Sequence, residues 1–315
     1  MKEKRKRPAG HGALSQWLNN PGHEIAVGEL PLFFRTLRIS FIFRRPPDID
    51  TGFRLLAAVR GALGRQLKKL ADERLIHGDK TPCAFHGLFA DHDWIGLQRH
   101  FAKPFVIWVT SSPDNICVEV SLFGQAGFWR DEIIDAMSRV MISRERGGEG
   151  GITMHSKTRA RRIWPLVDVF WRVREGYPVP SAKKAFIISS ITPIVMSGGN
   201  KLKGGFDDLL TSLCFRLAGL ARWHDVDAPD LISSALIARL RNRLVMEGLF
   251  GTRAEKYERR SISFGRMVKS ENGIMGHWYV RDYPEEMWPV FVLGTLTNFG
   301  FDVSQGAGRY VISDP

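Results

Sequence analysis

The chain has 315 residues, of which 44% are hydrophobic and 25% charged, and its formal net charge at pH 7 is +12. This length suits two domains of about 150 residues each. No apolar run approaches the roughly 20 residues of a membrane-spanning helix, and the basic segment 1–7 is not followed by the apolar core of a signal peptide. Neither a membrane span nor secretion is therefore expected. The positive charge favours a polyanionic partner, and nucleic acid is the commonest one.

Residues 1–30 are predicted to be a basic, poorly structured lead-in. The alternation of apolar and polar residues predicts strands, and apolar residues at helical spacing, such as Leu56, Val59 and Leu63, predict helices. The elements predicted for the first half are a strand over 34–43, a helix over 51–71, a hairpin of strands 104–110 and 116–123, a helix over 130–142 and a strand around 160–173.

The second half repeats this order. Its predicted elements are a strand over 185–196, a helix over 206–222, a hairpin of strands 260–269 and 274–281 turned at 270–273, a helix over 285–299 and a closing strand over 309–313. An insertion at 224–257 is expected to hold a further helix, with Leu231, Leu236, Leu240 and Leu244 facing inward.

Two β-α-β-β-α-β units in series predict an α+β protein of tandem ferredoxin-like domains. The expected domains are 31–173 and 174–315, and residues 166–184, rich in proline and charge, are interpreted as the joint between them.

A glycine-rich loop is predicted between the last helix and the last strand. It contains Gly300, Gly306 and Gly308 and is followed by Arg309. Glycines let the backbone approach a phosphate-bearing partner, and the arginine adds positive charge. A glycine cluster at 147–151 occupies the equivalent point of the first half.

The three cysteines, Cys83, Cys117 and Cys214, are widely spaced and include no Cys-x-x-Cys pair. They predict neither a structural zinc site nor a disulfide framework, and they fit a reducing, cytoplasmic compartment. Because no acidic cluster has metal-ligand spacing, a metal-dependent nuclease is not favoured. We expect no metal and no small-molecule cofactor.

Several stretches resemble a known family. They are the Arg-Gly-Ala-Leu-Gly segment at 60–64, Lys-Pro-Phe-Val-Ile at 103–107, Ser-Leu-Phe-Gly-Gln-Ala at 121–126, the segment from Phe206 with Arg216 and Arg222, and the glycine loop over 300–310. In this order and spacing the chain resembles the RNA-processing endoribonucleases of CRISPR systems, which belong to the RAMP superfamily. The resemblance covers about residues 31–315.

The resemblance implies metal-independent cleavage of CRISPR repeat RNA. It also implies that the protein retains the product and contacts other CRISPR effector subunits. The ribose 2′-hydroxyl attacks the adjacent phosphate and leaves a 2′,3′-cyclic phosphate and a 5′-hydroxyl. The reaction needs a base, an acid and cations. Of the nine histidines, His77 is the first candidate, because several relatives place a catalytic histidine just past this helix. Lys80 would stabilise phosphate charge. His77 can also be a polar helix-end residue.

A second solution uses arginine. Arg44, Arg45 and Arg54 flank the start of the first helix, and Arg54 and Lys68 fall near one face of it with Arg65. Clustered guanidinium groups stabilise a pentavalent phosphate, but an arginine with a pKa above about 12 is a poor base. A solvated helix face explains the same residues without catalysis.

Basic residues are the expected contacts to RNA phosphates, which give a salt-dependent affinity. The expected RNA-binding residues are Arg44, Arg45, Lys68, Lys201, Lys203, Arg260, Arg266, Lys269, His277, Gly306, Gly308 and Arg309. Trp94, Trp108 and Trp278 can stack on bases, although a core position is the simpler expectation for Trp108. Two alternatives stay open: a non-catalytic RAMP subunit that binds guide RNA in an effector complex, and an unrelated ferredoxin-like module that stacks bases on its sheet.

Overall fold

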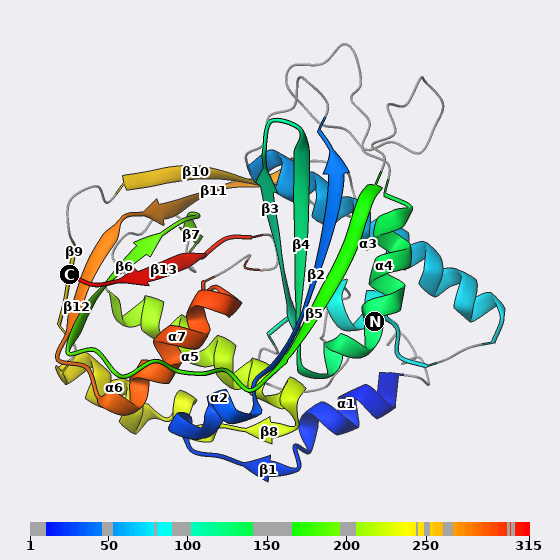
Figure 1. Cartoon of the computed structure of the whole chain (residues 1–315). Coiled ribbons are helices and arrows are strands. Elements are labelled where there is room, and N and C mark those ends of the chain that lie inside the picture. The colour runs from blue at the N-terminus through cyan, green and yellow to red at the C-terminus, as the bar shows by residue number, and fades with distance from the viewer. Residues whose placement is uncertain are drawn as a thin grey trace, which may run out of the picture.

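Two four-stranded antiparallel sheets, each covered by helices on one face, make up the core of the chain in this computed structural model (Figure 1). The structure describes residues 11–45, 53–78, 81–89, 102–140, 166–195, 206–243, 245–248, 253–260, 267–300, 303 and 306–315. Over these ranges, no helix combines the length and the apolar character that crossing a bilayer requires.

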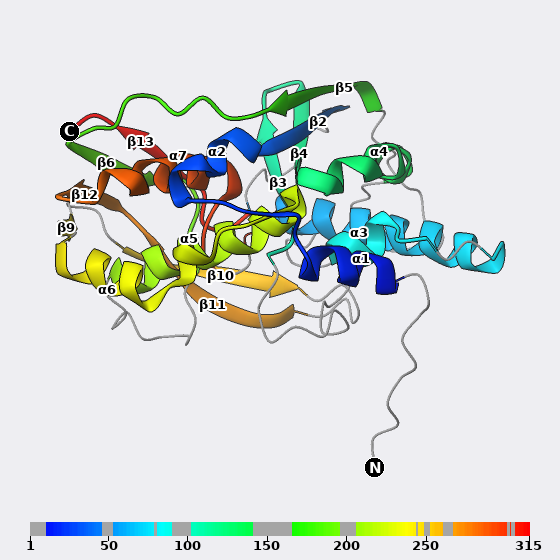
Figure 2. The ribbon, with the colours of Figure 1, turned by 90° about the horizontal axis from the view of Figure 1, so that it is seen from below.

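The first sheet has the strand order β3-β4-β2-β5. Its strands are β2 (Arg35–Arg44), β3 (Phe105–Ser111), β4 (Asn115–Phe123) and β5 (Leu166–Glu175). Side chains alternate between the faces of a strand, so Ile39, Phe41 and Phe43 are buried on one face. Helices α3 (Phe53–Ile76) and α4 (Arg130–Ser138) lie on that side, as Figure 2 shows.

The second sheet has the strand order β13-β6-β12-β9. It consists of β6 (Ala185–Ser190), β9 (Val245–Gly248), β12 (His277–Arg281) and β13 (Tyr310–Ser313), and α5 (Phe206–Ala221) and α7 (Trp288–Thr297) pack beside it. Phe186 is fully buried here, with ring centroids 5.3 Å from Trp288 and 5.0 Å from Phe291. These rings belong to one buried cluster that continues into the first half.

The predicted hairpin of 260–269 and 274–281 is wrong. The structure instead forms a hairpin from β10 (Arg253–Arg260) and β11 (Met267–Met275), and β11 also pairs with β7 (Ile194–Val195). The Asn272-Gly273 dipeptide lies inside β11, where Gly273 pairs with Glu255 and Val195. An added Cβ on Gly273 would overlap the Pro193 side chain, so this glycine permits close strand packing where a turn had been predicted.

The prediction of a poorly structured lead-in is wrong for residues 11–30. This segment forms α1 (His11–Asn19), β1 (His23–Glu24), the 3-10 turn η1 (Val27–Glu29) and the start of α2 (Leu30–Phe33). Leu14, Leu18 and Leu30 are buried. β1 pairs in parallel with β8 (Val226–Asp227) of the second half. Leu14 and Leu18 are four residues apart and so lie on one face of α1. The prediction missed this spacing because it extended the basic character of residues 1–7 over the whole segment.

The single strand predicted over 185–196 is wrong, because β6 and β7 are separate strands in different sheets. Other boundaries shift by a few residues. α3 extends five residues beyond the predicted end, and β5 occupies residues that had been interpreted as the joint, which leaves 176–184 as the connection. The inserted helix is confirmed as α6 (Ser234–Arg243), with Leu236 and Leu240 buried. Leu231 is buried in the preceding turn η6 (Pro229–Ile232), whereas Leu244 and the cluster at 147–151 lie outside the described residues.

Candidate nucleic-acid interface

The glycine loop at 306–309 lies between the two halves. Gly306 has φ +85° and Gly308 φ +73°, in the left-handed region that favours glycine. An added Cβ on Gly306 would overlap Cδ2 of Leu56 on α3, and one on Gly308 would overlap the carbonyl of Phe299. These glycines therefore permit close packing of the loop backbone against Leu56 of α3 and against the backbone of Phe299.

The amide groups of Gly306, Gly308 and Arg309 already donate hydrogen bonds within the protein. The N–H of Arg309 donates to Thr192 Oγ1 at 2.9 Å, and that hydroxyl donates to the Gly306 carbonyl at 2.8 Å. The Gly306 amide donates to the carbonyl of Val303, and the Gly308 amide to that of Pro193. An anion-binding nest needs free amide groups. In this loop, the side chain of Arg309 is thus the better candidate for contact with phosphate.

Arg309 reaches the first half. Its guanidinium carbon lies 3.8 Å from the ring centroid of Trp108, which is half-buried on β3. Burial lowers the pKa of Arg309, and the nearby carboxylate of Glu119 opposes that shift. The Nη1 group of Arg309 is buried without a hydrogen-bond partner among the described residues. Glu119 lies 3.4 Å from Nε of Arg38.

The structure separates His77 from this loop. His77 is exposed just past the end of α3, whereas the loop contacts Leu56 near the start. At a rise of about 1.5 Å per residue, the two positions are about 32 Å apart along the helix. One phosphate cannot contact both. Arg54 lies in the first turn of α3, but its side chain lies outside the described residues, as does Lys80.

Of the other predicted RNA-binding residues, Arg44 and Arg45 lie at the end of β2 beside the β3–β4 turn. Arg44 is exposed, and Arg45 donates from Nη1 to the Ser112 carbonyl at 3.0 Å. Lys68 is exposed on α3. The backbones of Arg260 and Lys269 lie on β10 and β11, a hairpin that contacts α3. The side chains of these two residues, and all of Lys201, Lys203 and Arg266, lie outside the described residues.

His277 is exposed on β12, and its Nδ1 lies 2.8 Å from Ser189 Oγ on β6. Ser189 pairs in turn with Val311 of β13. His277, Ser189 and Val311 therefore form one row across three strands of the second sheet. Arg309 precedes β13 and turns to Trp108 of the first half, so the structure places Arg309 with the glycine loop and His277 on the neighbouring sheet, and leaves His77 apart from both.

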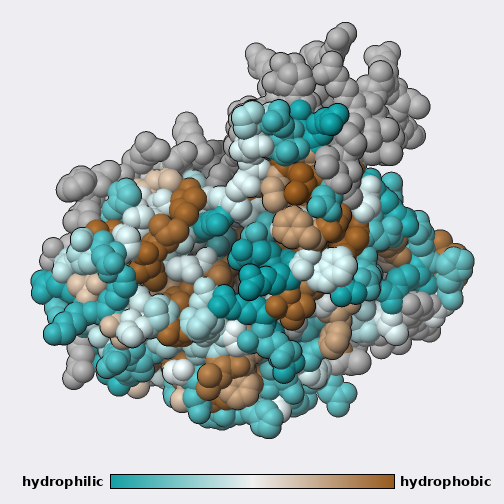
Figure 3. All heavy atoms as spheres, viewed as in Figure 1, coloured by the Kyte–Doolittle hydropathy of each residue, from teal (hydrophilic) through white to brown (hydrophobic). Residues whose placement is uncertain are grey.

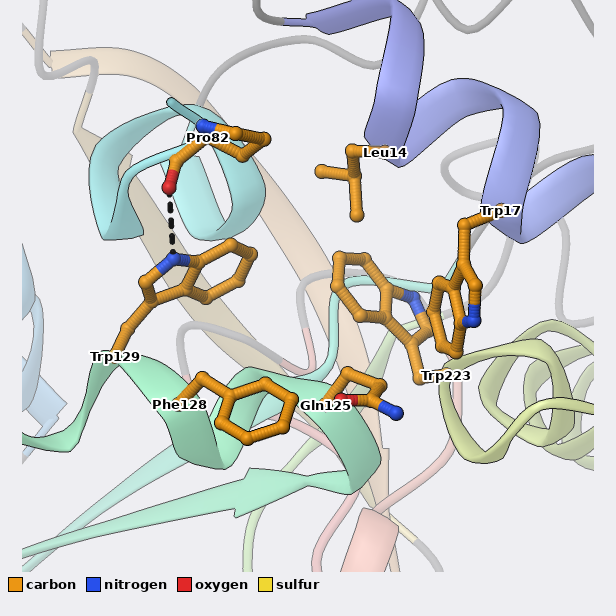
Figure 4. A pocket seen from close by; sticks show the side chains of 7 residues that line it. All are labelled: Leu14, Trp17, Pro82, Gln125, Phe128, Trp129 and Trp223. Carbon is orange, nitrogen blue, oxygen red and sulfur yellow. Dashed lines mark hydrogen bonds between the residues drawn. The ribbon is translucent and has the colours of Figure 1, made fainter. Parts of the chain in front are cut away.

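A cavity of about 340 Å³ lies elsewhere, beside α1 and the 3-10 helix η4 (Gly124–Trp129). Figure 4 shows its walls, which are Leu14, Trp17, Pro82, Gln125, Phe128, Trp129 and Trp223. The indole N–H groups of Trp129 and Trp223 donate to the carbonyls of Pro82 and Ala102. None of the seven lining residues titrates, so this cavity does not supply acid–base chemistry. Sequence reasoning missed it because its walls come from four separate segments.

Comparisons with known proteins find similar solved structures and no similar sequence family. No family model matches the sequence, and no curated protein matches it. Among solved structures, a Cas6 product complex superposes with a TM-score of 0.50 at 13% identity, covering 89% of this chain and 99% of that one. Thermus thermophilus Cas6 gives 0.49 at 14% identity, covering 89% and 98%. A structure described as a RAMP protein binding different RNA substrates gives 0.42 at 12% identity, covering 88% and 100%.

The chain is thus an α+β protein whose core is two four-stranded antiparallel sheets, with a glycine loop between its halves. This is the fold of Cas6 proteins, shared over almost the whole chain.

Proposed function

We propose that the protein binds CRISPR precursor RNA, cleaves it within the repeat to give mature guide RNA, and retains this product. The observation that carries the proposal is the fold shared with a Cas6 product complex over 89% of the chain. The net charge of +12 supports it, because RNA binding needs neutralisation of phosphate charge. Arg309, stacked between the halves, supplies positive charge at the loop.

The two halves are interpreted as ferredoxin-like domains, 31–173 and 174–315. In each sheet the first and third strands of the half are central, and the second and fourth lie at the edges. We assign RNA binding to the region between them. The residues assigned to it are Arg44, Arg45, Lys68, Lys201, Lys203, Arg260, Arg266, Lys269, His277, Gly306, Gly308 and Arg309.

The proposed reaction requires no metal. The 2′-oxygen attacks phosphorus as its proton passes to a base, the bond to the 5′-oxygen breaks, and an acid protonates that leaving oxygen. The products are a 2′,3′-cyclic phosphate and a 5′-hydroxyl. His77 with Lys80 is one candidate set, at the C-terminal end of α3. Arg54 is the other, at the N-terminal end, where the glycine loop packs. Since Arg54 and His77 are about 35 Å apart along the helix, only one of the two sets serves a given phosphate.

The separation of His77 from the loop also supports a second function. A RAMP subunit that holds guide RNA in an effector complex needs the cations but no base. Such a protein would use Arg309 and the basic hairpin β10–β11, and its histidines would have no role in cleavage.

Incubation of the purified protein with labelled repeat RNA in EDTA distinguishes these functions. A product that ends in a 2′,3′-cyclic phosphate supports the metal-independent nuclease, whereas tight binding with intact RNA supports the subunit. Cleavage rates of His77→Ala and Arg54→Ala then show which of the two candidate sets is the catalytic site. We expect one variant to lose cleavage by about 100-fold or more, in the range of general acid–base catalysis, while the other cleaves normally. Full activity in both variants would exclude both site assignments.

A further inference from the structure

One face of the first sheet carries arginines and aromatic rings, and none of the described helices lies over it (Figure 2). The open face is defined here as the face opposite α3 and α4, with Arg38, Trp108, Glu119, Phe170, Arg172 and Arg174. Cross-strand pairing places these residues together: Arg38 pairs with Arg172, and Ser40 pairs with both Phe170 and Glu119, which itself pairs with Trp108. Figure 3 shows this side of the molecule, where hydrophilic residues surround hydrophobic ones.

The arginine pair is electrostatically unfavourable. Arg38 and Arg172 lie directly opposite each other on neighbouring strands, where Cβ atoms are about 5 Å apart and like charges repel. Glu119 lies 3.4 Å from Arg38, but Arg172 has no acidic partner among the described residues. An anion bound between the two guanidinium groups would remove this repulsion.

Phe170 is the neighbouring aromatic platform. It is 52% exposed and lies two residues from Arg172, on the same face. The row from Phe170 through Ser40 and Glu119 to Trp108 crosses three strand spacings, or about 14 Å. At its far end Arg309 stacks on Trp108. Rings and guanidinium groups thus extend from the glycine loop to the edge strand β5.

The charge of the open face indicates which class of partner it binds. Arg38, Arg172 and Arg174 lie on this face and Arg309 stacks at its edge, whereas its carboxylates are Glu119 and Asp168. The Asp168 carboxylate accepts a hydrogen bond from the Val169 amide. A second copy of this chain, with a net charge of +12, would be repelled. Exposed aromatic rings among arginines are typical of surfaces that bind single-stranded nucleic acid.

We propose that the open face binds a single-stranded flank of the RNA, with a base stacked on Phe170 and a phosphate between Arg38 and Arg172. This inference rests on the proposed function, because it assumes that RNA is already held at the glycine loop. It adds a second contact surface, which extends the bound RNA from Arg309 across the sheet to β5.

The test uses two probes, a stem-loop RNA with a uridine flank of about ten nucleotides and the same stem-loop without the flank. Fluorescence anisotropy measures their affinity for the wild type, for Phe170→Ala/Arg172→Ala and for a matched control, Phe215→Ala/Arg139→Ala. The control removes the same side-chain types at exposed positions on α5 and at the end of α4. All the substituted side chains are exposed, so folding should be preserved.

We expect the flank to raise the wild-type affinity by about five- to a hundredfold, the effect of stacking one base. The double variant should lose this gain and the control should keep it. The salt dependence for the flanked RNA should also become shallower in the double variant, by about 0.7 in log–log slope for each lost phosphate contact.

An equal gain in the double variant and the wild type would overturn the inference, and so would tight binding of both probes without any gain from the flank. Binding of neither probe by the wild type would instead overturn the proposed function. Light scattering tests whether the open face instead binds a second copy of the protein. If the wild type is a dimer, and the double variant is a monomer with unchanged RNA affinity, the open face is a protein contact.

Discussion

The guanidinium carbon of Arg309 lies 3.8 Å from the centroid of the Trp108 ring. Arg309 immediately precedes the last strand of the second half, and Trp108 lies on the edge strand β3 of the first. A cation over an indole ring is stabilised by the ring quadrupole, by about 0.5–2 kcal/mol. This contact therefore joins the two halves and also fixes the orientation of a cation beside the glycine loop.

The stacking of Arg309 on Trp108 predicts that a positive charge at position 309 is not enough for full RNA affinity. In Arg309→Lys the positive charge remains, but the planar group that stacks on Trp108 is lost. We expect the RNA affinity to fall by about fivefold or more, equivalent to roughly 1 kcal/mol of cation–π interaction. Anisotropy with labelled repeat RNA measures this. Arg281→Lys, at an exposed position on β12, is the control and should bind normally. An unchanged affinity in Arg309→Lys would mean that the stacking has no role in binding.

The packing of the glycine loop predicts a large loss of stability in Gly306→Ala. The new methyl group would overlap Leu56, and φ of +85° is unfavourable for alanine. Each effect costs about 1–3 kcal/mol, so the free energy of unfolding should fall by about 2–6 kcal/mol in urea denaturation. Gly28→Ala is the control, because no atom lies within 4 Å of its added Cβ.

A double-mutant cycle separates the two causes. Leu56→Ala removes the overlapping group, so Gly306→Ala should be less destabilising in that background than in the wild type. Additive effects of the two substitutions would show that backbone strain alone accounts for the loss.

The N-terminal segment predicts a third result. Leu18 is fully buried, and its carbonyl accepts a hydrogen bond from Nη1 of Arg222 at 3.1 Å. Leu18→Ala should lower the free energy of unfolding by about 2–5 kcal/mol, because it leaves a cavity in the core. Leu32→Ala, at a position 74% exposed, should change it by less than about 0.5 kcal/mol. Equal effects in the two variants would contradict the finding that this segment belongs to the core.

Sequence reasoning predicted features that local periodicity determines. Leu56, Val59 and Leu63 were placed on the inner face of a helix, and all three are buried. It failed at Asn272-Gly273, where a local turn preference is overridden by pairing with β10 and packing on Pro193. The same dipeptide would favour a turn in a free hairpin. Local preference is a weak guide where tertiary contacts compete.

The interface could not be predicted, because its partners are distant in sequence. Nothing near Trp108 indicates that Arg309, about two hundred positions later, stacks on it. The glycine loop was identified from composition, but composition does not show whether a glycine approaches a phosphate or a leucine. The predicted helix over 51–71 placed Arg54 at its start and His77 past its end, but it did not show that the glycine loop packs at the Arg54 end.

His224 predicts a pH dependence of stability. It follows α5, in the 3-10 turn η5 (Arg222–His224), and its ring stacks on Phe34 with centroids 4.5 Å apart. Nδ1 lies 2.9 Å from the Leu220 carbonyl and Nε2 lies 3.0 Å from the Arg35 carbonyl. Burial lowers the pKa of His224, although hydrogen bonds to these carbonyls oppose the shift. The folded protein therefore binds this proton less readily than the unfolded chain.

When the folded pKa is below the unfolded value of about 6.5, the unfolded state binds more protons as the pH falls, and the free energy of unfolding decreases. We expect this loss between about pH 7.5 and about pH 5, measured by urea denaturation at each pH. His224→Gln keeps a donor for one carbonyl but does not titrate, so its stability should fall less over the same interval. If wild type and variant lost stability in parallel, the proton would bind elsewhere. A stability that rose as the pH fell, and rose less in His224→Gln, would show that the two carbonyls favour the charged ring and outweigh burial.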